Sequence, residues 1–254
     1  VFLVGFPTML VEFVVGRRSG TDAVSAFETL GFGEWSFVGK LGVFTSFVTL
    51  AFYSVVGGWV LSYIVGSLTG AYFGDAATYF GTIASGPTAV AAQAVFVAAT
   101  VGIVALGVAD GIERATTIMI PAILVLLVGL AVWAGTLDGA AAGYGYYLSP
   151  DVDALVANAG SIIPSAVGQA FFTLSLGFGV MIAYASYLGR DDSLPADGTA
   201  IVVINTLVAL LAGFVVFPLV FAIDGSVPTE GGSGTAFTAL AAAFGQLPFG
   251  TVVG

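Results

Sequence analysis

The sequence predicts an all-α protein that crosses a membrane several times. Of its 254 residues, 58% are hydrophobic and 8% are charged, whereas an ordinary soluble domain carries about 25% charged residues. The mean hydropathy is +1.08. The apolar residues gather in long segments, and about 20 such residues in a helix cross a hydrocarbon core of about 30 Å. Because a chain in lipid must satisfy its own backbone hydrogen bonds, these segments are expected to be helices.

Short polar or Gly/Pro-rich connections separate the apolar segments, and no low-complexity tract interrupts them. One transmembrane domain is therefore expected to cover residues 1–254. The first segment is shorter than the roughly 20 residues of a full crossing and begins at Val1 rather than at Met, so we interpret the chain as a fragment. The predicted helices are about 1–16, 41–69, 88–108, 112–136, 164–189 and 198–224.

Composition also narrows the function. The chain has no Cys and no His, which argues against disulfides and against the usual zinc sites. Its net charge of −10 makes a nucleic-acid partner unexpected, because phosphate binding needs basic patches. No nucleophile–base pair is visible, so we do not expect an enzyme.

The five basic residues indicate how the chain is oriented. They lie in alternate connections, which places them on one side if the helices simply alternate. The positive-inside rule makes that side cytoplasmic, with the chain in the cell membrane as a multi-pass protein. The cytoplasmic loops would be 17–40, 109–114 and 190–197, which carry Arg17, Arg18, Lys40, Arg114 and Arg190.

The stretch "GQAFFTLSLGFG" (168–179) places polar and glycine residues inside an apolar segment. Ser175 lies about 16 Å of helix from Pro164, near the bilayer midplane. A helix that breaks there leaves free carbonyls at the end of its first half, and with the hydroxyls of Thr173 and Ser175 they suit a small cation or an ammonium group. Alternatively, Gly, Ser and Thr only permit close helix packing, or the hydroxyls bond their own helix.

Two further polar residues fall at similar depth. Tyr53 is about 18 Å from the inner end of its segment, and Asn205 is about 10 Å from the inner end of its own. Glu12 is the one acid well inside a segment, where a carboxylate is costly and usually functional. It lies about 7.5 Å along the helix from Arg17. A buried structural or gating role, an interfacial position and a protonated carboxyl all remain open for Glu12.

Several blocks, in order along the chain, resemble the bacterial neurotransmitter:sodium symporters. The block "VGQAFFTLSLGFGVMIAYASYLGRDD" (167–192) is similar to their sixth helix, and it is specific to that family. The other blocks resemble the second helix ("LVGFPTMLVEFVVGRRSG", 3–20), the third ("FYSVVGGWVLSYIV", 52–65), the fifth ("GIERATTIMIP", 111–121) and the seventh ("INTLVALLAGFVVFP", 204–218).

This resemblance implies a sodium-coupled amino-acid transporter that works by alternating access. It also implies an inverted-repeat (5+5) fold, here incomplete, with a discontinuous helix at 164–189. The implied substrate-binding residues are Tyr53, Thr49, Phe172, Ser175 and Phe178. The implied Na⁺ ligands are Thr173 and Asn205. The implied gating or structural residues are Glu12, Gly111, Pro121, Gln169, Gly177, Gly179 and Tyr187.

The resemblance leaves several questions open. The family's first and eighth helices, which carry most of the other ligands, have no counterpart here, so the second sodium site cannot be assigned. Gln169 matches a residue of the family's chloride region. Ala209, however, stands where chloride-dependent members carry Ser and chloride-independent members an acid, which leaves chloride dependence undecided. The competing hypotheses are a proton-coupled permease of the same fold and a non-transporting, truncated relic. The residues do not identify the amino acid.

Overall fold

The computed structural model describes residues 1–224, 237–238 and 241, and those residues form helices and turns without a strand. The chain divides into two compact units. Unit 1 comprises Val1–Ala51 and Pro150–Ala209, and unit 2 comprises Phe52–Ser149 and Leu210–Gly254. The expected single domain stays a prediction.

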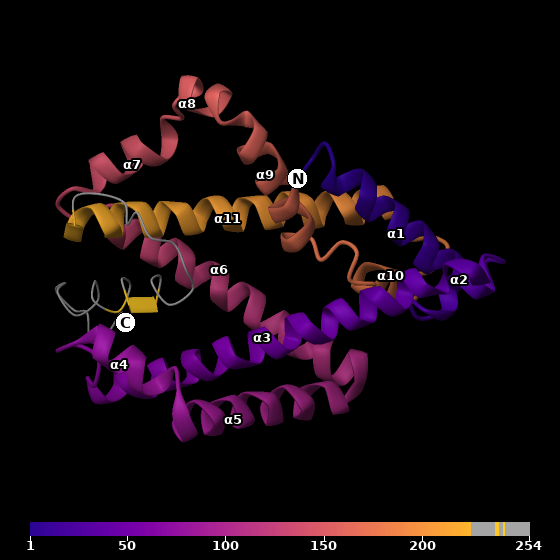
Figure 1. The fold of residues 1–254 in the computed structure, drawn as a ribbon, viewed down its shortest axis with the longest axis horizontal. Coiled ribbons are helices and arrows are strands. Elements are labelled where there is room, and N and C mark those ends of the chain that lie inside the picture. Colours follow the sequence, from indigo (N-terminus) through magenta and orange to yellow (C-terminus); the bar gives the residue numbers. More distant parts are fainter. Residues whose placement is uncertain (225–236, 239–240, 242–254) are drawn as a thin grey trace. The chain divides into compact units, whose positions relative to one another are not determined.

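Unit 1 joins the start of the chain to the predicted broken helix. It contains the first part of the long helix α3 and the first part of α11, which both continue into unit 2. Figure 1 shows α1 beside α10, which follows it by more than 160 residues. Its helices are α1 (Gly5–Ser19), α2 (Ser25–Thr29), η1 (Gly33–Trp35), α3 (Ser36–Thr69), α8 (Val152–Ala157), α9 (Ala159–Thr173), α10 (Val180–Ala185) and α11 (Leu194–Asp224).

The core of unit 1 forms where α1 packs against α9, α10 and α11. Met9 and Val202 are fully buried there, with Phe13 and Leu174 nearly so. Gly16 allows the closest approach, because a Cβ at this position would overlap the Ile182 carbonyl. A glycine on α1 therefore sets the distance between α1 and α10.

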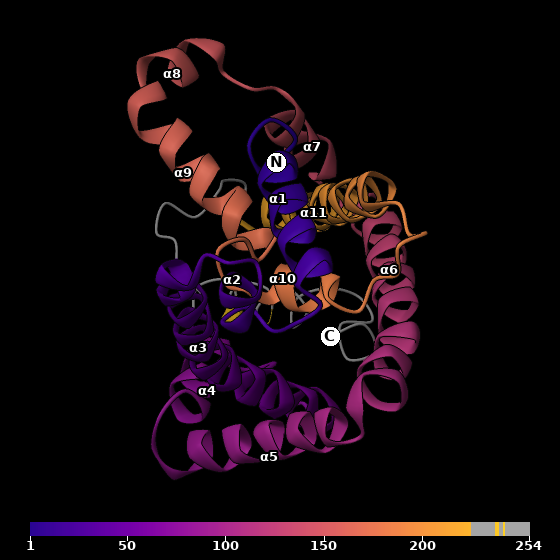
Figure 2. The ribbon, with the colours of Figure 1, turned by 90° about the vertical axis from the view of Figure 1, so that its right-hand side faces the viewer.

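Unit 2 contains the remaining helices. Figure 2 shows α5 running back along α3 after the short helix α4. The α3–α5 packing includes a hydrogen bond of 2.8 Å from Gln93 Nε2 to Ser54 Oγ. Asp75 begins α4, since its side chain accepts from Thr78 N at 2.9 Å. The helices are α4 (Ala76–Ile83), α5 (Gly86–Ala105), the π-helical turn η2 (Val108–Glu113), α6 (Arg114–Ala134) and α7 (Ala140–Leu148).

Four helical stretches are long and apolar enough to span a membrane: Gly33–Thr69, Gly86–Ala105, Asp110–Ala134 and Leu194–Ala222. The predicted class, an all-α polytopic membrane protein, is thus confirmed. The bounds differ from the expected ones by up to five residues at most helix ends; the expected helix 41–69, for example, is α3 at Ser36–Thr69. The expected helix 1–16 is α1 at Gly5–Ser19. The expected discontinuous helix 164–189 is indeed interrupted: it consists of α9 (Ala159–Thr173) and α10 (Val180–Ala185), separated by residues 174–179.

Candidate functional site

The break between α9 and α10 is built from left-handed backbone. Ser175, Gly177 and Gly179 have φ angles of 54°, 80° and 75°. Glycine adopts this region without steric cost, but Ser175 is the one non-glycine residue with positive φ in the described part of the chain. Such outliers cost of order 1–3 kcal/mol and persist where the surroundings hold them. The strained backbone at Ser175 therefore indicates that neighbouring residues hold the break in place.

The end of α9 is closed by local turn bonds. Leu174 N donates to Ala170 O at 3.3 Å, Ser175 N to Phe172 O at 3.1 Å and Leu176 N to Phe171 O at 2.9 Å. The sequence argument expected free carbonyls at this helix end. The structure shows that three of them already accept one bond each, and each carbonyl oxygen retains a second lone pair.

Glu12 holds the middle of the break from α1. The Gly177 N–H donates to Glu12 Oε1 at 2.7 Å across 165 positions of sequence. A distant carboxylate thus supplies the acceptor that the interrupted helix lacks.

Helix α3 supports the same segment from another side, and sequence reasoning missed both of its contributors. Ser46 Oγ donates to Phe178 O at 2.9 Å. A Cβ at Gly42 would lie only 3.0 Å from the Phe178 carbonyl carbon. Gly42 and Ser46 are four residues apart, and this small-xxx-small spacing on an apolar helix is the signal that would have indicated a close contact.

Thr173 and Asn205, the two residues with an implied sodium role, are brought together. Thr173 Oγ1 donates to Asn205 Oδ1 at 3.1 Å, which links the end of α9 to α11. Both side chains are half-buried. Two oxygen atoms thus converge beside the helix break, and such oxygens are the ligands that hard cations prefer.

The two phenylalanines of the expected substrate pocket also lie close together. The rings of Phe172 and Phe178 meet edge to face, with centroids 6.3 Å apart. They flank Ser175, which occupies the strained position between them. The break therefore presents an aromatic pair next to polar oxygens.

The other expected residues are less closely grouped. Thr49 lies half-buried on the unit 1 part of α3, whereas Tyr53 belongs to unit 2. Gln169 is exposed on α9, and Tyr187 is 72% exposed in the turn after α10. Their roles stay predictions. Nearby, Arg17 Nη1 donates to Asp192 O at 2.8 Å, a contact that sequence reasoning did not indicate.

Gly111 and Pro121 lie in unit 2, at a second irregular helix. Gly111 is inside the π-helical turn that precedes α6, and Pro121 is inside α6 itself. A Cβ at Gly111 would overlap the Ile103 carbonyl. Of these two implied gating or structural residues, Gly111 thus coincides with a helix irregularity, whereas Pro121 lies in the α-helix that follows it.

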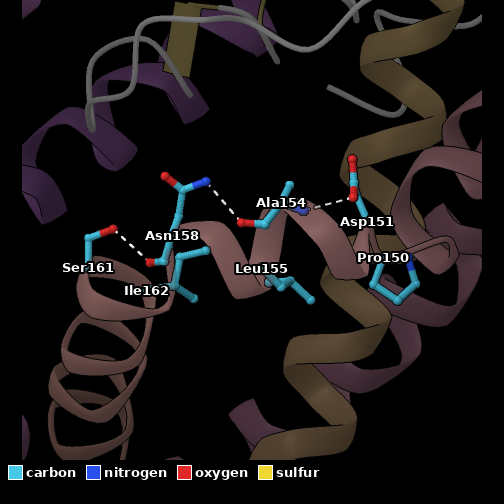
Figure 3. Close-up of a pocket in the computed structure, with 7 residues that line it drawn as sticks. All are labelled: Pro150, Asp151, Ala154, Leu155, Asn158, Ser161 and Ile162. Atoms are coloured by element: carbon cyan, nitrogen blue, oxygen red, sulfur yellow. Dashed lines mark hydrogen bonds between the residues drawn. The ribbon is translucent and has the colours of Figure 1, made fainter.

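A separate hollow of about 460 Å³ lies over the connection that contains α8 (Figure 3). Its polar side chains bond their own backbone: Asp151 Oδ1 accepts from Ala154 N at 2.9 Å, and Asn158 Nδ2 donates to Ala154 O at 2.9 Å. Ser161 Oγ likewise donates to Asn158 O at 3.0 Å. These groups build the turns around α8, and nothing in their arrangement indicates a binding role.

Comparison of the sequence with known proteins identifies a family model and several relatives that match this chain. The sequence model of the "Sodium:neurotransmitter symporter family" matches residues 81–254. An uncharacterized sodium-dependent transporter of Bacillus subtilis is 42% identical over 98% of this chain and 56% of its own length. Another, of Methanocaldococcus jannaschii, is 36% identical over 97% of this chain and 53% of its own length.

More distant matches carry substrate names. The mouse sodium- and chloride-dependent neutral and basic amino acid transporter B(0+) is 26% identical over 53% of this chain and 22% of its own length. The chain spans about half the length of the sodium-dependent transporters of Bacillus subtilis, Haemophilus influenzae and Methanocaldococcus jannaschii that it matches. With the family sequence model matching well over half of its residues, the chain belongs to the sodium:neurotransmitter symporter family.

Proposed function

We propose that the complete protein carries an amino acid across the membrane together with sodium. The observation that carries this proposal is the Thr173–Asn205 pair, whose oxygens converge at 3.1 Å beside the broken helix of a sodium symporter family member. In the proposal these two side chains ligate Na⁺. The family membership and the sodium-dependent relatives support the coupling ion.

The break would receive the substrate. Phe172 and Phe178 supply apolar walls, and the half-buried Ser175 between them in sequence contributes a hydroxyl and main-chain groups. Thr49 and Tyr53 of α3 are proposed to complete the pocket. An amino acid fits this chemistry, and the substrate in the name of the mouse transporter is of the same class.

Four further residues are proposed to support movement. Glu12 fixes the break, and Tyr187 is proposed to act at the inner gate. Gly111 and Pro121 are proposed to let the start of α6 unwind and release sodium. The π-helical turn at Val108–Glu113 is consistent with that role, because π-turns inside helices are frequent at functional sites.

The direct test is uptake of labelled amino acids by vesicles that contain the complete protein, with and without a sodium gradient. We expect Thr173→Val to raise the sodium concentration for half-maximal uptake about tenfold, as the loss of roughly 1.4 kcal/mol of binding would do. Thr173→Ser keeps a hydroxyl oxygen at this position and should retain most of the sodium affinity. The matched control is Thr206→Val, since Thr206 Oγ1 bonds its own helix at Val202 O, 2.7 Å away.

The outcomes separate the competing functions. Equal uptake with and without sodium would remove the sodium proposal. Uptake driven by a pH gradient would favour the proton-coupled alternative, and no uptake of any amino acid by folded protein would favour a non-transporting protein. Adding or omitting chloride in the same vesicles would decide the chloride question that Ala209 leaves open.

Orientation is part of the proposal. We propose that the loops 17–40, 109–114 and 190–197 face the cytoplasm, because they contain all five basic residues. Residues 1–254 contain no Cys, so single cysteines introduced here report accessibility once any Cys elsewhere in the complete protein has been replaced. A Ser19→Cys variant should react with a membrane-impermeant thiol reagent only from the cytoplasmic side, and Ser85→Cys only from the outer side. The reverse pattern would overturn the orientation.

A further inference from the structure

Phe178 lies between two glycines with left-handed backbone. Gly177 and Gly179 have φ angles of 80° and 75°. Because glycine adopts positive and negative φ about equally well, the peptide groups on either side of Phe178 can rotate at little steric cost. The Phe178 side chain is half-buried, so packing alone leaves its ring some freedom. Contacts from neighbouring helices are therefore needed to fix the direction of this residue.

Ser46 on α3 supplies such a contact to the Phe178 main chain. Its Oγ donates to Phe178 O at 2.9 Å. Rotation of the peptide between Phe178 and Gly179 would carry this oxygen away from Ser46 and break the bond. A Cβ at Gly42 would lie 3.0 Å from the Phe178 carbonyl carbon and 3.1 Å from Gly179 N. Helix α3 thus lies directly against the peptide that Ser46 binds.

The same face of α3 continues into the proposed substrate pocket. Gly42, Ser46 and Thr49 are spaced at i, i+4 and i+7, which places them on one side of the helix. Gly42 is buried, and the other two are half-buried. Thr49 lies about 4.5 Å beyond Ser46 along the helix axis. The bond from Ser46 therefore also sets where Phe178 lies relative to Thr49, another wall of that pocket.

We propose that Ser46 is a positioning residue for substrate selection. By holding the Phe178 carbonyl, it fixes the Phe178 ring in its edge-to-face contact with Phe172, at a centroid distance of 6.3 Å. This role rests on the proposed function, in which the pocket receives an amino acid. A wall that is already in place binds a fitting side chain without a further cost of ordering, whereas a mobile wall discriminates less between side chains.

The first measurement follows the Phe178 ring and does not use transport. The complete protein carries para-fluorophenylalanine in place of Phe178 as its sole fluorine, and it should give one narrow fluorine NMR resonance. Ser46→Ala removes the hydrogen-bond donor, so the resonance should shift or split as other orientations of the ring become populated. Thr45→Val is the matched control and should leave the resonance unchanged, because Thr45 Oγ1 bonds its own helix at Leu41 O, 2.9 Å away. An unchanged resonance in Ser46→Ala would overturn the proposal.

The second measurement is the uptake of a panel of the standard amino acids by vesicles with a sodium gradient. We expect Ser46→Ala to raise the KM of the best substrate about fivefold, the factor that the loss of one ordinary hydrogen bond would give. Its kcat should change little, because the wall acts in binding. The ratio of kcat/KM between the best and the poorest substrate should fall by a similar factor. Ser46→Thr keeps a hydroxyl donor and should retain this ratio, as should Thr45→Val.

The ratio separates selection from a general loss of folded transporter. Less folded protein lowers the uptake of every substrate equally and leaves the ratio as it was. A changed resonance with an unchanged ratio in Ser46→Ala would overturn the role in selection. If the unsubstituted protein takes up no amino acid, the proposed function fails, and the fluorine resonance still decides whether Ser46 positions Phe178.

Discussion

The chain contains two irregular helices that differ in what supports them. The break at 174–179 depends on Glu12 and Ser46, which lie 165 and 132 positions away from the residues they bond. The π-helical turn at Val108–Glu113 instead packs on the chain just before it, with Gly111 against Ile103. The first irregularity is therefore a tertiary structure, and the second is largely a local one.

This difference teaches how each can respond to change. A segment that distant groups hold can be released when those groups move. The conformation of the break therefore depends on the positions of α1 and α3, which carry Glu12 and Ser46. A local π-turn can shift its register without any other helix moving. Substitutions at the distant supports should therefore affect the break, and substitutions at the π-turn should stay near it.

The largest effect is expected from Gly16→Val. A side chain there would overlap the Ile182 carbonyl, a backbone atom that cannot move aside. Overpacking typically costs 1–3 kcal/mol, and we expect about 3 kcal/mol or more here. Thermal unfolding of the complete protein measures it. Gly160→Ala is the control, since nothing lies within 4 Å of a Cβ at that position of α9. An equal, small effect of both would show that α1 and α10 are not closely packed.

Glu12→Leu should have the next largest effect. It removes the acceptor of the exposed Gly177 N–H, and such a hydrogen bond contributes about 1 kcal/mol with a neutral acceptor and up to about 3 kcal/mol with a charged one. We expect faster hydrogen exchange across 174–179 and a matching loss of uptake. Glu12→Gln keeps an acceptor oxygen and should retain part of both. Glu28→Leu, at an exposed acid on α2, should change neither; unchanged exchange in Glu12→Leu would contradict the supporting role.

The π-turn offers the converse test. Gly111→Ala places a Cβ on the Ile103 carbonyl, which should cost about 1–2 kcal/mol of local stability. We expect faster hydrogen exchange confined to residues near 108–117, with the break unchanged. Gly102→Ala has no atom within 4 Å of the new Cβ and should be neutral or slightly stabilising. A change at 174–179 in Gly111→Ala would show that the two irregular helices are coupled.

The sequence predicts the helices and the position of the break well, but it predicts poorly the contacts between residues that are far apart in sequence. Apolar length identifies the long helices, and the Ser and Gly residues of "TLSLGFG" indicate a break, because these properties belong to the segment itself. Helix depth brings Thr173 near Asn205, as the structure shows. The spacing of Gly42 and Ser46 indicates a close contact but not its partner, because Phe178 O is a main-chain atom that leaves no trace in residue identity. The same holds for Asp192 O, the partner of Arg17. Tyr53 shows another limit. Its predicted depth is similar to that of Thr173 and Asn205, but Tyr53 belongs to unit 2, whereas the other two residues belong to unit 1.

The smallest expected effect concerns Asp22, in the turn between α1 and α2. Hydrogen bonds from the Ser25 side chain and from the Ser25 and Val24 N–H groups lower the pKa of Asp22 below its ordinary value. The turn is therefore fully stabilised above the ordinary pKa of about 4. That stabilisation is lost as the pH falls through the lower folded-state pKa.

Hydrogen exchange over residues 22–30, compared with an Asp22→Asn variant at each pH, isolates this contribution. Asn can still accept the N–H bonds but does not titrate. The ratio of the two exchange rates should be constant above about pH 5 and should change only in more acidic solution. Because Asp22 is exposed, we expect the change to stay within this turn and to leave the break at 174–179 as it was. A parallel change at the break would mean that Ala23 in the turn and Phe27 on α2 help to hold the broken helix. The turn would then belong with Glu12 and Ser46 among the distant groups that support the break.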